Sequence, residues 1–414
     1  MLFNKIDMSD NSLQNTIFDG EYGIEKESLR VTPDLKLSQT LHNFGGNEHI
    51  SRDFCENQVE LITDVFTSID GALDQLRSLH EEVFIKLRKD NELLWYFSNP
   101  PKVDSEDEIP IAMIDSEKYN YRSYLSQKYG KAKMLYSGIH LNFSFPEKTI
   151  AAMYERSDYT DPFHFKNALY ISLAAKLVKY SWLIVYLTAA SPLADDSFLS
   201  MLGVPEGSRK SYASFRCSEH GYWNSFTPVF DFSNLERYVN SIKDMIDSGK
   251  IVSCSELYYP IRLKCGSRYT LEDLLSKGIS HIELRMLDVN PLSDIGIFRE
   301  DIEFIHILIL YLLSQDSEVF TENDQVQAIS NMKNAALYND TAAKISDVPL
   351  KDAALEELQR IAQFTKQYFP QYDNIINYQI NNISKGKRYA ELINSTLKNN
   401  YLKGGAALSA KYRG

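Results

Sequence analysis

The sequence has few cysteines, and none of them has the spacing of a zinc site or a redox motif. Cys55, Cys217, Cys254 and Cys265 are scattered over 414 residues, and no two of them form a CxxC pair. Scattered free thiols are typical of a reducing compartment, so we expect a cytoplasmic protein. Cys55 lies within an acidic segment, where it is either a redox-sensitive thiol or an ordinary buried cysteine.

Other features are also missing, and each absence excludes a class of protein. The amino terminus lacks the basic stretch and apolar core of a secretory signal. No GxGxxG follows a predicted strand and no GxxxxGK(S/T) occurs, which argues against Rossmann and P-loop nucleotide binding. Positive charge is not in excess, since 56 acidic and 44 basic residues give a net charge of −12. We therefore expect no binding to nucleic acid or to membranes.

Long hydrophobic runs are absent as well. The two most apolar segments are residues 168–194 and 304–313, and the first is interrupted by Lys176 and Lys179. Its uncharged run is shorter than the roughly 20 residues that span a bilayer, so both segments are predicted to be buried helices. Residues 68–91 also carry apolar side chains at helical spacing.

Helical and strand-like segments alternate without a regular β–α–β pattern, which predicts the α+β class. In such a fold helices cover one face of the sheet, and the other face keeps its polar residues. Residues 193–230, rich in Gly, Ser and Pro, are predicted to be long loops. We expect residues 1–414 to form a single domain that is mostly helical from about residue 294. A loose tail is expected after about residue 401.

What the sequence does contain is a set of short segments that alternate polar and apolar side chains. Glu25 and Glu27 are two residues apart, so both side chains point to the same face of a strand. Two carboxylates on one half-buried face repel each other unless something positive lies between them. The pair therefore points to a divalent cation.

Three further segments show the same alternation. Their polar members are Glu56, Gln58 and Glu60; His140, Asn142 and Ser144; and His281, Glu283 and Arg285. Asp53 has the opposite parity to Glu60 and reaches the same face only if the strand bends or bulges. A related strand at 256–264 places Arg262 and Lys264 on one face.

Together these faces predict one metal site. Its ligands are the carboxylates Glu25, Glu27, Glu60 and Glu283, with Asp53 if the strand bends, and His140 as a nitrogen ligand. Oxygen ligands in this number suit Mg²⁺ or Mn²⁺, which commonly bridge nucleotide phosphates to protein. Arg285 would offset charge on a transferring phosphoryl group. The alternative for any one segment is a solvated sheet face, because antiparallel sheets commonly expose one polar face.

The same segments resemble those of bacterial glutamate–cysteine ligases, most closely the ligase portion of the bifunctional glutathione-synthesising enzymes. The matching stretches are GIEKESLRV at 23–31, DFCENQVELIT at 53–63, YSGIHLNFS at 136–144, SELYYPIRLK at 255–264 and HIELRMLDVNPLSDIGI at 281–297. They occur in family order, between about residues 15 and 315. The sequence departs from the family pattern at Leu141, where an aromatic residue is more usual, and at Cys55.

The resemblance implies a role for each matching residue. The metal-binding set would be Glu25, Glu27, Asp53, Glu60, His140 and Glu283, with Arg285, Glu283 and Glu27 acting in catalysis. Arg216 and Tyr222 would bind the amino-acid substrate, and Phe54, Tyr121 and Tyr258 would line the cysteine pocket. For Tyr121 and Tyr258 the alternative is an ordinary core tyrosine, and for Arg216 it is a surface arginine in a loop.

The resemblance also implies a fold and a reaction. The fold would be like those of glutamine synthetase and the guanidino kinases, a curved, mainly antiparallel sheet that forms an open funnel covered by helices. The enzyme would be a monomer using Mg²⁺ or Mn²⁺, and ATP as co-substrate. It would join L-glutamate to L-cysteine through γ-glutamyl phosphate, the first step of glutathione biosynthesis.

Two alternatives stay open. In place of a glutamate–cysteine ligase, the chain would be a γ-glutamyl ligase for another amine or amino acid, or a non-catalytic relative that senses glutamate or nucleotide. Because no second ATP-grasp domain follows in this sequence, we expect the dipeptide as product and not glutathione.

Overall fold

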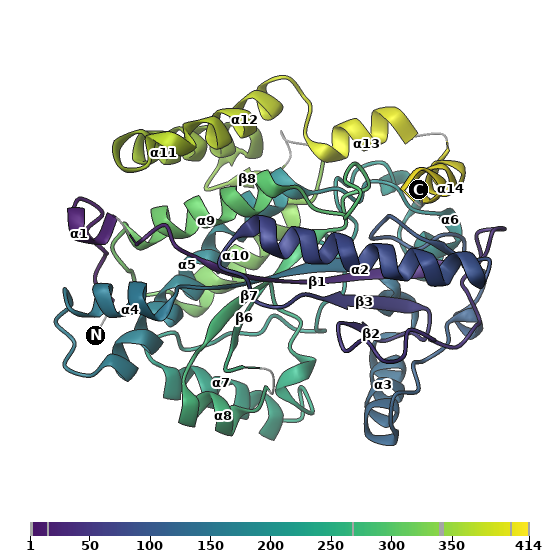
Figure 1. Cartoon of the computed structure of the whole chain (residues 1–414), viewed down its shortest axis with the longest axis horizontal. Helices are drawn as coiled ribbons and strands as arrows, with labels where there is room; N and C mark the ends of the chain where they lie inside the picture. Colours follow the sequence, from purple (N-terminus) through teal and green to yellow (C-terminus); the bar gives the residue numbers. More distant parts are fainter. Residues whose placement is uncertain (1–2, 15, 267–268, 339–342, 398–399, 413–414) are drawn as a thin grey trace.

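An antiparallel sheet forms the centre of the computed structural model, which describes residues 3–14, 16–266, 269–338, 343–397 and 400–412 (Figure 1). The strand order is β2-β3-β1-β5-β7-β6, and β4 pairs with the end of β1. The strands are β1 (Glu21–Val31), β2 (Ile50–Arg52), β3 (Gln58–Ile62), β4 (Leu93–Leu94), β5 (Gly138–Ser144), β6 (Ile261–Lys264) and β7 (His281–Asp288). The pairings between these strands are antiparallel, which confirms the α+β class with a mainly antiparallel sheet.

Three helices cover one face of this sheet, as the alternation of its strands predicts. They are α2 (Ile69–Lys89), α5 (Pro162–Thr188) and α9 (Arg299–Leu313). Helix α2 packs on β1 and β3, whereas α5 packs on β6 and β7 and touches α9. Ser68 begins α2 by accepting a hydrogen bond from the Gly71 N–H at 3.1 Å. The apolar side chains of the three helices and of the covered sheet face form one large core.

Helix α5 is long and apolar enough to cross a membrane by length and composition, with 67% of its most apolar window buried inside the protein. It contacts the sheet, α9 and α10 (Glu322–Ala335). A buried core helix passes the same test of length and composition, so this helix is weak evidence for a membrane span. Its packing matches the prediction of a buried helix.

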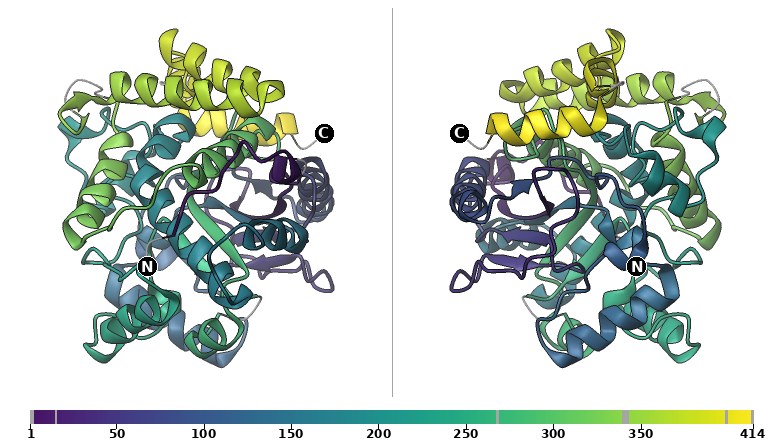
Figure 2. Two further views of the ribbon diagram at one scale, coloured as in Figure 1. Left: turned by 90° about the vertical axis from the view of Figure 1, so that its left-hand side faces the viewer. Right: turned by 90° about the vertical axis from the view of Figure 1, so that its right-hand side faces the viewer.

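The remaining elements surround this centre. The other helices are α1 (Asn11–Gln14), α3 (Ser116–Tyr129), α4 (Glu147–Tyr154), α6 (Asp196–Met201), α7 (Leu235–Asp247), α8 (Leu271–Lys277), α11 (Leu350–Tyr368), α12 (Asp373–Ser384), α13 (Tyr389–Leu397) and α14 (Tyr401–Tyr412). Short 3₁₀ helices span η1 (Glu106–Glu108), η2 (Ala132–Leu135), η3 (Glu206–Ser208), η4 (Cys254–Glu256) and η5 (Pro370–Tyr372), and β8 (Lys344–Ile345) pairs with β9 (Val348–Pro349). Helices α11 to α14 lie together at the end of the molecule opposite to α7 and α8 (Figure 2).

The expected loose tail after about residue 401 is wrong, because residues 401–412 form helix α14. The Gly-Gly pair that suggested flexibility allows close packing. A Cβ added to Gly405 would lie 2.2 Å from the Trp95 ring. Tyr401 donates to the Asn99 carbonyl at 2.7 Å, and Ser409 donates to the Leu94 carbonyl at 2.6 Å. The helical character expected from about residue 294 is confirmed, with β8 and β9 as a short exception.

Residues 51–63, predicted as one strand, are two strands joined by a turn. The Gln58 N–H donates to the Cys55 carbonyl at 3.0 Å, and the Asp53 N–H donates to the Gln58 carbonyl at 3.3 Å. Glu56 lies in this turn, so the prediction that it shares a face with Glu60 is wrong. Its carboxylate accepts instead from Arg52, His42 and Met113. The same turn is the bend that Asp53 required.

Candidate functional site

A cavity of about 430 Å³ opens on the sheet face that α2 and α9 leave uncovered. Alternation along β1 points Glu25 and Glu27 to this face, while Lys26 points the other way, to His80 of α2. All site residues predicted from the sequence line the cavity: Glu25, Glu27, Asp53, Phe54, Glu60, Tyr121, His140, Arg216, Tyr222, Tyr258, Glu283 and Arg285. The structure therefore brings residues from distant segments into one place.

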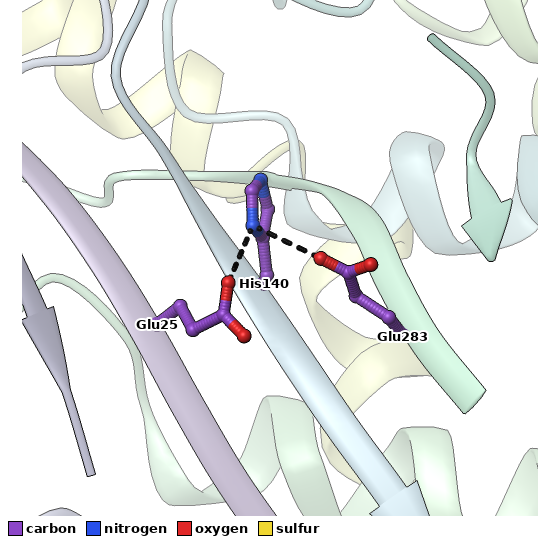
Figure 3. Close-up of side chains that lie close together, drawn as sticks. All are labelled: Glu25, His140 and Glu283. Atoms are coloured by element: carbon purple, nitrogen blue, oxygen red, sulfur yellow. Dashed lines mark hydrogen bonds and ion pairs between the residues drawn. The ribbon is translucent and has the colours of Figure 1, made fainter. Parts of the chain in front are cut away.

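Three of these residues meet at the centre (Figure 3). His140 Nδ1 lies 3.2 Å from an oxygen of Glu25 and 3.4 Å from an oxygen of Glu283. They come from the adjacent strands β5, β1 and β7, and their ligand atoms all lie within 4.8 Å of one another. Asn142 supports this group by donating to Glu25 at 3.0 Å.

Glu27 and Glu60 face each other across the β1–β3 pair. Glu27 accepts a hydrogen bond from the Gly138 N–H at 2.8 Å. Burial, followed by the charge of Asp53, raises the pKa of Glu27 to about 8. Burial also raises the pKa of Glu60 well above its usual range, and the charges of Asp53 and Glu25 raise it further. The positive charges of the protein are therefore too few to hold both carboxylates in their ionised form.

Glu283 differs because cations surround it. Arg285 donates to it at 2.6 Å, and the nitrogens of Lys264 and Arg262 lie 3.7 Å and 3.8 Å from its other oxygen. Burial opposes the ionisation of Glu283, but the three positive charges outweigh burial and hold its pKa well below the usual range. Oε2 of Glu283 is buried and accepts no hydrogen bond from the residues that the structure describes.

The donor set fits a divalent cation. Burial lowers the pKa of His140, as does the charge of Arg285, and both favour the neutral imidazole that binds metals. Carboxylates with raised pKa values and the unpaired oxygen of Glu283 would be stabilised by a cation among them. Hard oxygen ligands with one nitrogen suit Mg²⁺ or Mn²⁺.

A β-bulge shapes β7 opposite His140. Ile139 pairs with Leu287 and Leu141 pairs with Leu284, so β7 carries one more residue than β5 over this stretch. Arg216 donates to the carbonyls of Arg285 at 2.9 Å and Leu287 at 3.1 Å.

The neighbouring Cys217 thiol donates to the carbonyl between these two, that of Met286, at 3.1 Å. Gly138 leaves room for Arg216, since a Cβ there would lie 1.9 Å from the guanidinium. The alternative of a surface arginine in a loop is therefore wrong for Arg216.

Aromatic side chains and α3 close the other side of the cavity. The rings of Tyr222 and Tyr258 lie 3.8 Å apart between centroids, and Phe54 lines the same cavity. Helix α3 contributes Tyr121 and Arg122, and the Nη1 atom of Arg122 is buried without a hydrogen-bond partner in the described chain.

Sequence reasoning missed several cations of the cavity, namely Lys118, Arg122, Arg262 and Lys264. The alternation at 256–264 had signalled Arg262 and Lys264 but gave no reason to join them to Glu283. Lys118 and Arg122 lie on a helix whose tertiary position the sequence does not indicate.

Comparison with known proteins gives consistent results. The family model described as glutamate-cysteine ligase matches residues 6–251 and 249–335. A bifunctional glutathione biosynthesis protein of Listeria monocytogenes is 41% identical over 384 residues, covering 87% of this chain and 50% of that protein. One from Clostridium perfringens is 34% identical, covering 91% of this chain and 51% of that protein. The chain thus spans about half the length of the curated relatives it matches.

Two solved structures share the fold. A bifunctional glutathione synthetase from Pasteurella multocida superposes with a TM-score of 0.87 at 26% identity, covering 98% of this chain and 54% of the other. A glutamate–cysteine ligase from Francisella tularensis in complex with AMP gives a TM-score of 0.85 at 24% identity, covering 95% of this chain and 88% of the other.

Proposed function

The chain belongs to the glutamate–cysteine ligase family, and from that premise we propose that it joins L-glutamate to L-cysteine at the expense of ATP. One observation carries the proposal. The carboxylates and His140 line the same cavity as the cations Arg285, Arg262 and Lys264. The products would be γ-glutamylcysteine, ADP and phosphate. We further infer that residues 1–414 act as one catalytic domain, whose curved sheet forms an open funnel like that of glutamine synthetase and the guanidino kinases.

We assign the divalent cations, Mg²⁺ or Mn²⁺, to one set of residues. These are Glu25, Glu27, Asp53, Glu60, His140 and Glu283. When bound, such cations offset the charge of phosphate oxygens and act as Lewis acids. The AMP complex of the Francisella ligase supports binding of an adenine nucleotide by this fold.

The chemistry begins with a poor acyl donor. The γ-carboxylate of glutamate is negative and lacks a leaving group, so one of its oxygens attacks the γ-phosphorus of ATP and ADP leaves. The amine then attacks the carbonyl carbon of the γ-glutamyl phosphate, and phosphate is expelled. Arg285 supplies a fixed positive charge toward the transferring phosphoryl group, and its 2.6 Å bond to Glu283 keeps it oriented.

The acceptor amine is assigned to the aromatic side of the cavity. Phe54, Tyr121, Tyr222 and Tyr258 line this side. Arg216 lies between them and β7, where it both lines the cavity and holds the bulged strand. Tyrosines offer an apolar ring with a polar hydroxyl, which suits a small amino acid.

An amine panel tests this proposal. We expect ADP release that depends on glutamate and on divalent cation, with cysteine among the best amines and γ-glutamylcysteine identified by mass spectrometry. If cysteine is among the poorest amines, the chain is a γ-glutamyl ligase for another acceptor. If no amine supports ADP release while glutamate or nucleotide binds, the chain is a non-catalytic sensor.

We also propose that the enzyme acts as a monomer in the cytoplasm. All four cysteines are free and buried, which suits a reducing compartment. The molar mass of the purified chain, measured by light scattering, tests whether it is a monomer.

A further inference from the structure

Behind the aromatic side of the cavity lies a buried carboxylate that the proposed chemistry does not use. Glu256 ends η4 and is fully buried. Its Oε1 accepts hydrogen bonds from Nζ of Lys128 at 2.5 Å and from the hydroxyl of Tyr129 at 2.7 Å. Its Oε2 accepts the Val252 N–H at 2.8 Å. A charged acceptor with several donors makes a strong attachment point in a protein interior.

Asn224 extends this attachment to a third segment of the chain. Its amide nitrogen donates to the Glu256 carbonyl at 2.8 Å and to the Tyr129 hydroxyl at 3.0 Å. Its amide oxygen accepts the Tyr258 N–H at 2.9 Å. We call Glu256, Lys128, Tyr129 and Asn224 the anchor cluster. It ties together helix α3, the segment around residue 224 and the segment 256–258.

Each of these three segments contributes one tyrosine to the cavity. Tyr121 comes from α3, Tyr222 precedes Asn224 by two residues, and Tyr258 follows Glu256 by two. The Tyr129 ring meets the Tyr258 ring edge-on at 5.4 Å and the Tyr222 ring at 6.3 Å. The anchor cluster therefore contacts Tyr222 and Tyr258 directly and reaches Tyr121 only through helix α3.

Helix α3 has little other support from packing. Leu125 is the one residue of α3 that is buried, and the helix projects from the body of the molecule (Figure 1). A helix with so little buried apolar surface gains little stability from packing. Tyr121 and Arg122 line the cavity from α3, so their positions depend on the position of this helix.

We propose that Glu256 is a positioning residue for the acceptor amine, acting through α3, Tyr222 and Tyr258. This inference rests on the proposed ligase function. The phosphoryl-transfer side of the cavity is built on β1, β5 and β7, and none of the anchor-cluster hydrogen bonds named above involves these strands. Arg262 links the two sides, since it lies 3.8 Å from Glu283 and donates to the Leu257 backbone carbonyl, but it does not bond to the Glu256 carboxylate. Loss of the anchor cluster should therefore weaken binding of the amine and spare formation of γ-glutamyl phosphate.

The test separates the two half-reactions. Tyr129→Phe removes one hydroxyl and keeps the ring, while Glu256→Gln removes the central charge. We expect each variant to raise KM for the amine about ten-fold, the scale of one lost hydrogen bond to a charged group. KM for ATP and for glutamate, and positional isotope exchange within ATP without amine, should change less than two-fold, about the scale of a surface substitution.

Glu357 provides a matched control far from the cavity lining. It is a buried carboxylate on α11 that accepts from Tyr311 at 2.8 Å, from Tyr180 at 3.4 Å and from Arg360 at 2.7 Å. Glu357→Gln should cost stability as Glu256→Gln does, yet leave KM for the amine unchanged. The rate of hydrogen exchange of the α3 amides should rise in Glu256→Gln and not in Glu357→Gln.

Two results would overturn the inference. One is an equal rise in KM for ATP, glutamate and amine, which would make the anchor cluster a general stability element. The other is an unchanged KM for the amine in Tyr129→Phe and in folded Glu256→Gln. An inactive wild-type chain would instead overturn the proposed ligase function, and the inference with it.

Discussion

The two faces of β1 differ in the partners that they give to buried charged residues. On the cavity face, Glu27 stands opposite Glu60, and burial raises the pKa of both. On the covered face, Arg30 is nearly inaccessible but lies 2.9 Å from Glu92. On one face of the strand two carboxylates thus face each other, whereas on the other face Arg30 has a carboxylate partner.

The covered face shows how a fold accommodates charge for its own stability. The terminal nitrogens of Arg30 donate to Thr40, Glu92 and the Glu56 carbonyl. The second oxygen of Glu92 accepts from Ser38 at 2.6 Å. The charges of Arg30 and Glu92 are thus paired within the protein at the back of the sheet, and this pair needs no ligand.

The cavity face does the reverse. Carboxylates gather with too few protein cations on the β1–β3 side and with three cations around Glu283 on the β7 side. Such an arrangement costs stability and persists where a ligand completes it. The contrast predicts that cavity-face substitutions alter activity and that covered-face substitutions alter stability.

The largest expected effect is on activity, from Glu27→Gln. We expect glutamate-dependent ADP release to fall about 1000-fold or more, since a ligand and its charge are lost from the proposed metal site. Because burial raises the pKa of Glu27 to about 8, the neutral amide resembles the form that the fold favours. Urea unfolding at pH 7 should therefore show no loss of stability.

Glu21→Gln is the control for this substitution. Glu21 lies on the same face of β1 but outside the cavity lining, where it accepts from Ser144 at 2.8 Å. Its replacement should leave ADP release nearly unchanged. Equal activity of Glu27→Gln and wild type would contradict the metal assignment.

The next effect is on stability, from Glu92→Gln on the covered face. Removing one partner of a buried ion pair leaves Arg30 charged and unneutralised, which costs about 3 kcal/mol. The free energy of unfolding in urea measures this loss, and kcat per folded molecule should stay near the wild-type value. Asp74→Asn, which breaks the exposed pair with Arg77, should cost less than about 1 kcal/mol.

A smaller effect depends on pH and also belongs to the covered face. His306 is buried on α9 with its Nδ1 atom 2.8 Å from the Tyr22 hydroxyl, and burial lowers its pKa to about 3. The fold therefore favours the neutral ring. The stability it contributes is complete above pH 6.5 and is lost as pH falls toward 3.

Each pH unit in that window should remove about 1.4 kcal/mol through His306. His306→Gln keeps an acceptor for Tyr22 but cannot titrate. Urea unfolding of both proteins from pH 7 to pH 4 measures the difference in slope. Identical slopes would show that His306 does not titrate with unfolding.

Local alternation predicted much of this site because strand parity is a property of the sequence itself. Glu25, Glu27, His140 and Glu283 all face the cavity as alternation required. Parity does not show which strands are neighbours, so the meeting of β1, β5 and β7 around His140 needed the family resemblance or the structure.

The failures have physical causes of their own. Glu56 does not share the face of Glu60 because its segment forms a turn. Its carboxylate accepts hydrogen bonds from Arg52 and from a backbone N–H, which alternation cannot show. The tail after residue 401 is helical because Gly405 packs against Trp95 and Gly404 packs against Leu397, where a Cβ would clash. Both outcomes also involve a residue that is distant in sequence, Met113 for Glu56 and Trp95 for Gly405.

The smallest effect concerns Cys55, which lies two residues from Asp53 but does not share its exposure to the cavity. Its side chain is fully buried in an apolar cluster that includes Leu29 and Trp95, and burial raises the pKa of the thiol. A buried thiol with a raised pKa is a poor nucleophile.

We therefore expect Cys55 to resist alkylation in the folded protein and to react after unfolding in urea. Cys55→Ala should change kcat less than two-fold and cost about 1 kcal/mol of stability. Rapid labelling of the native enzyme with loss of activity would instead favour a redox-sensitive thiol, because only a thiolate open to solvent reacts in this way.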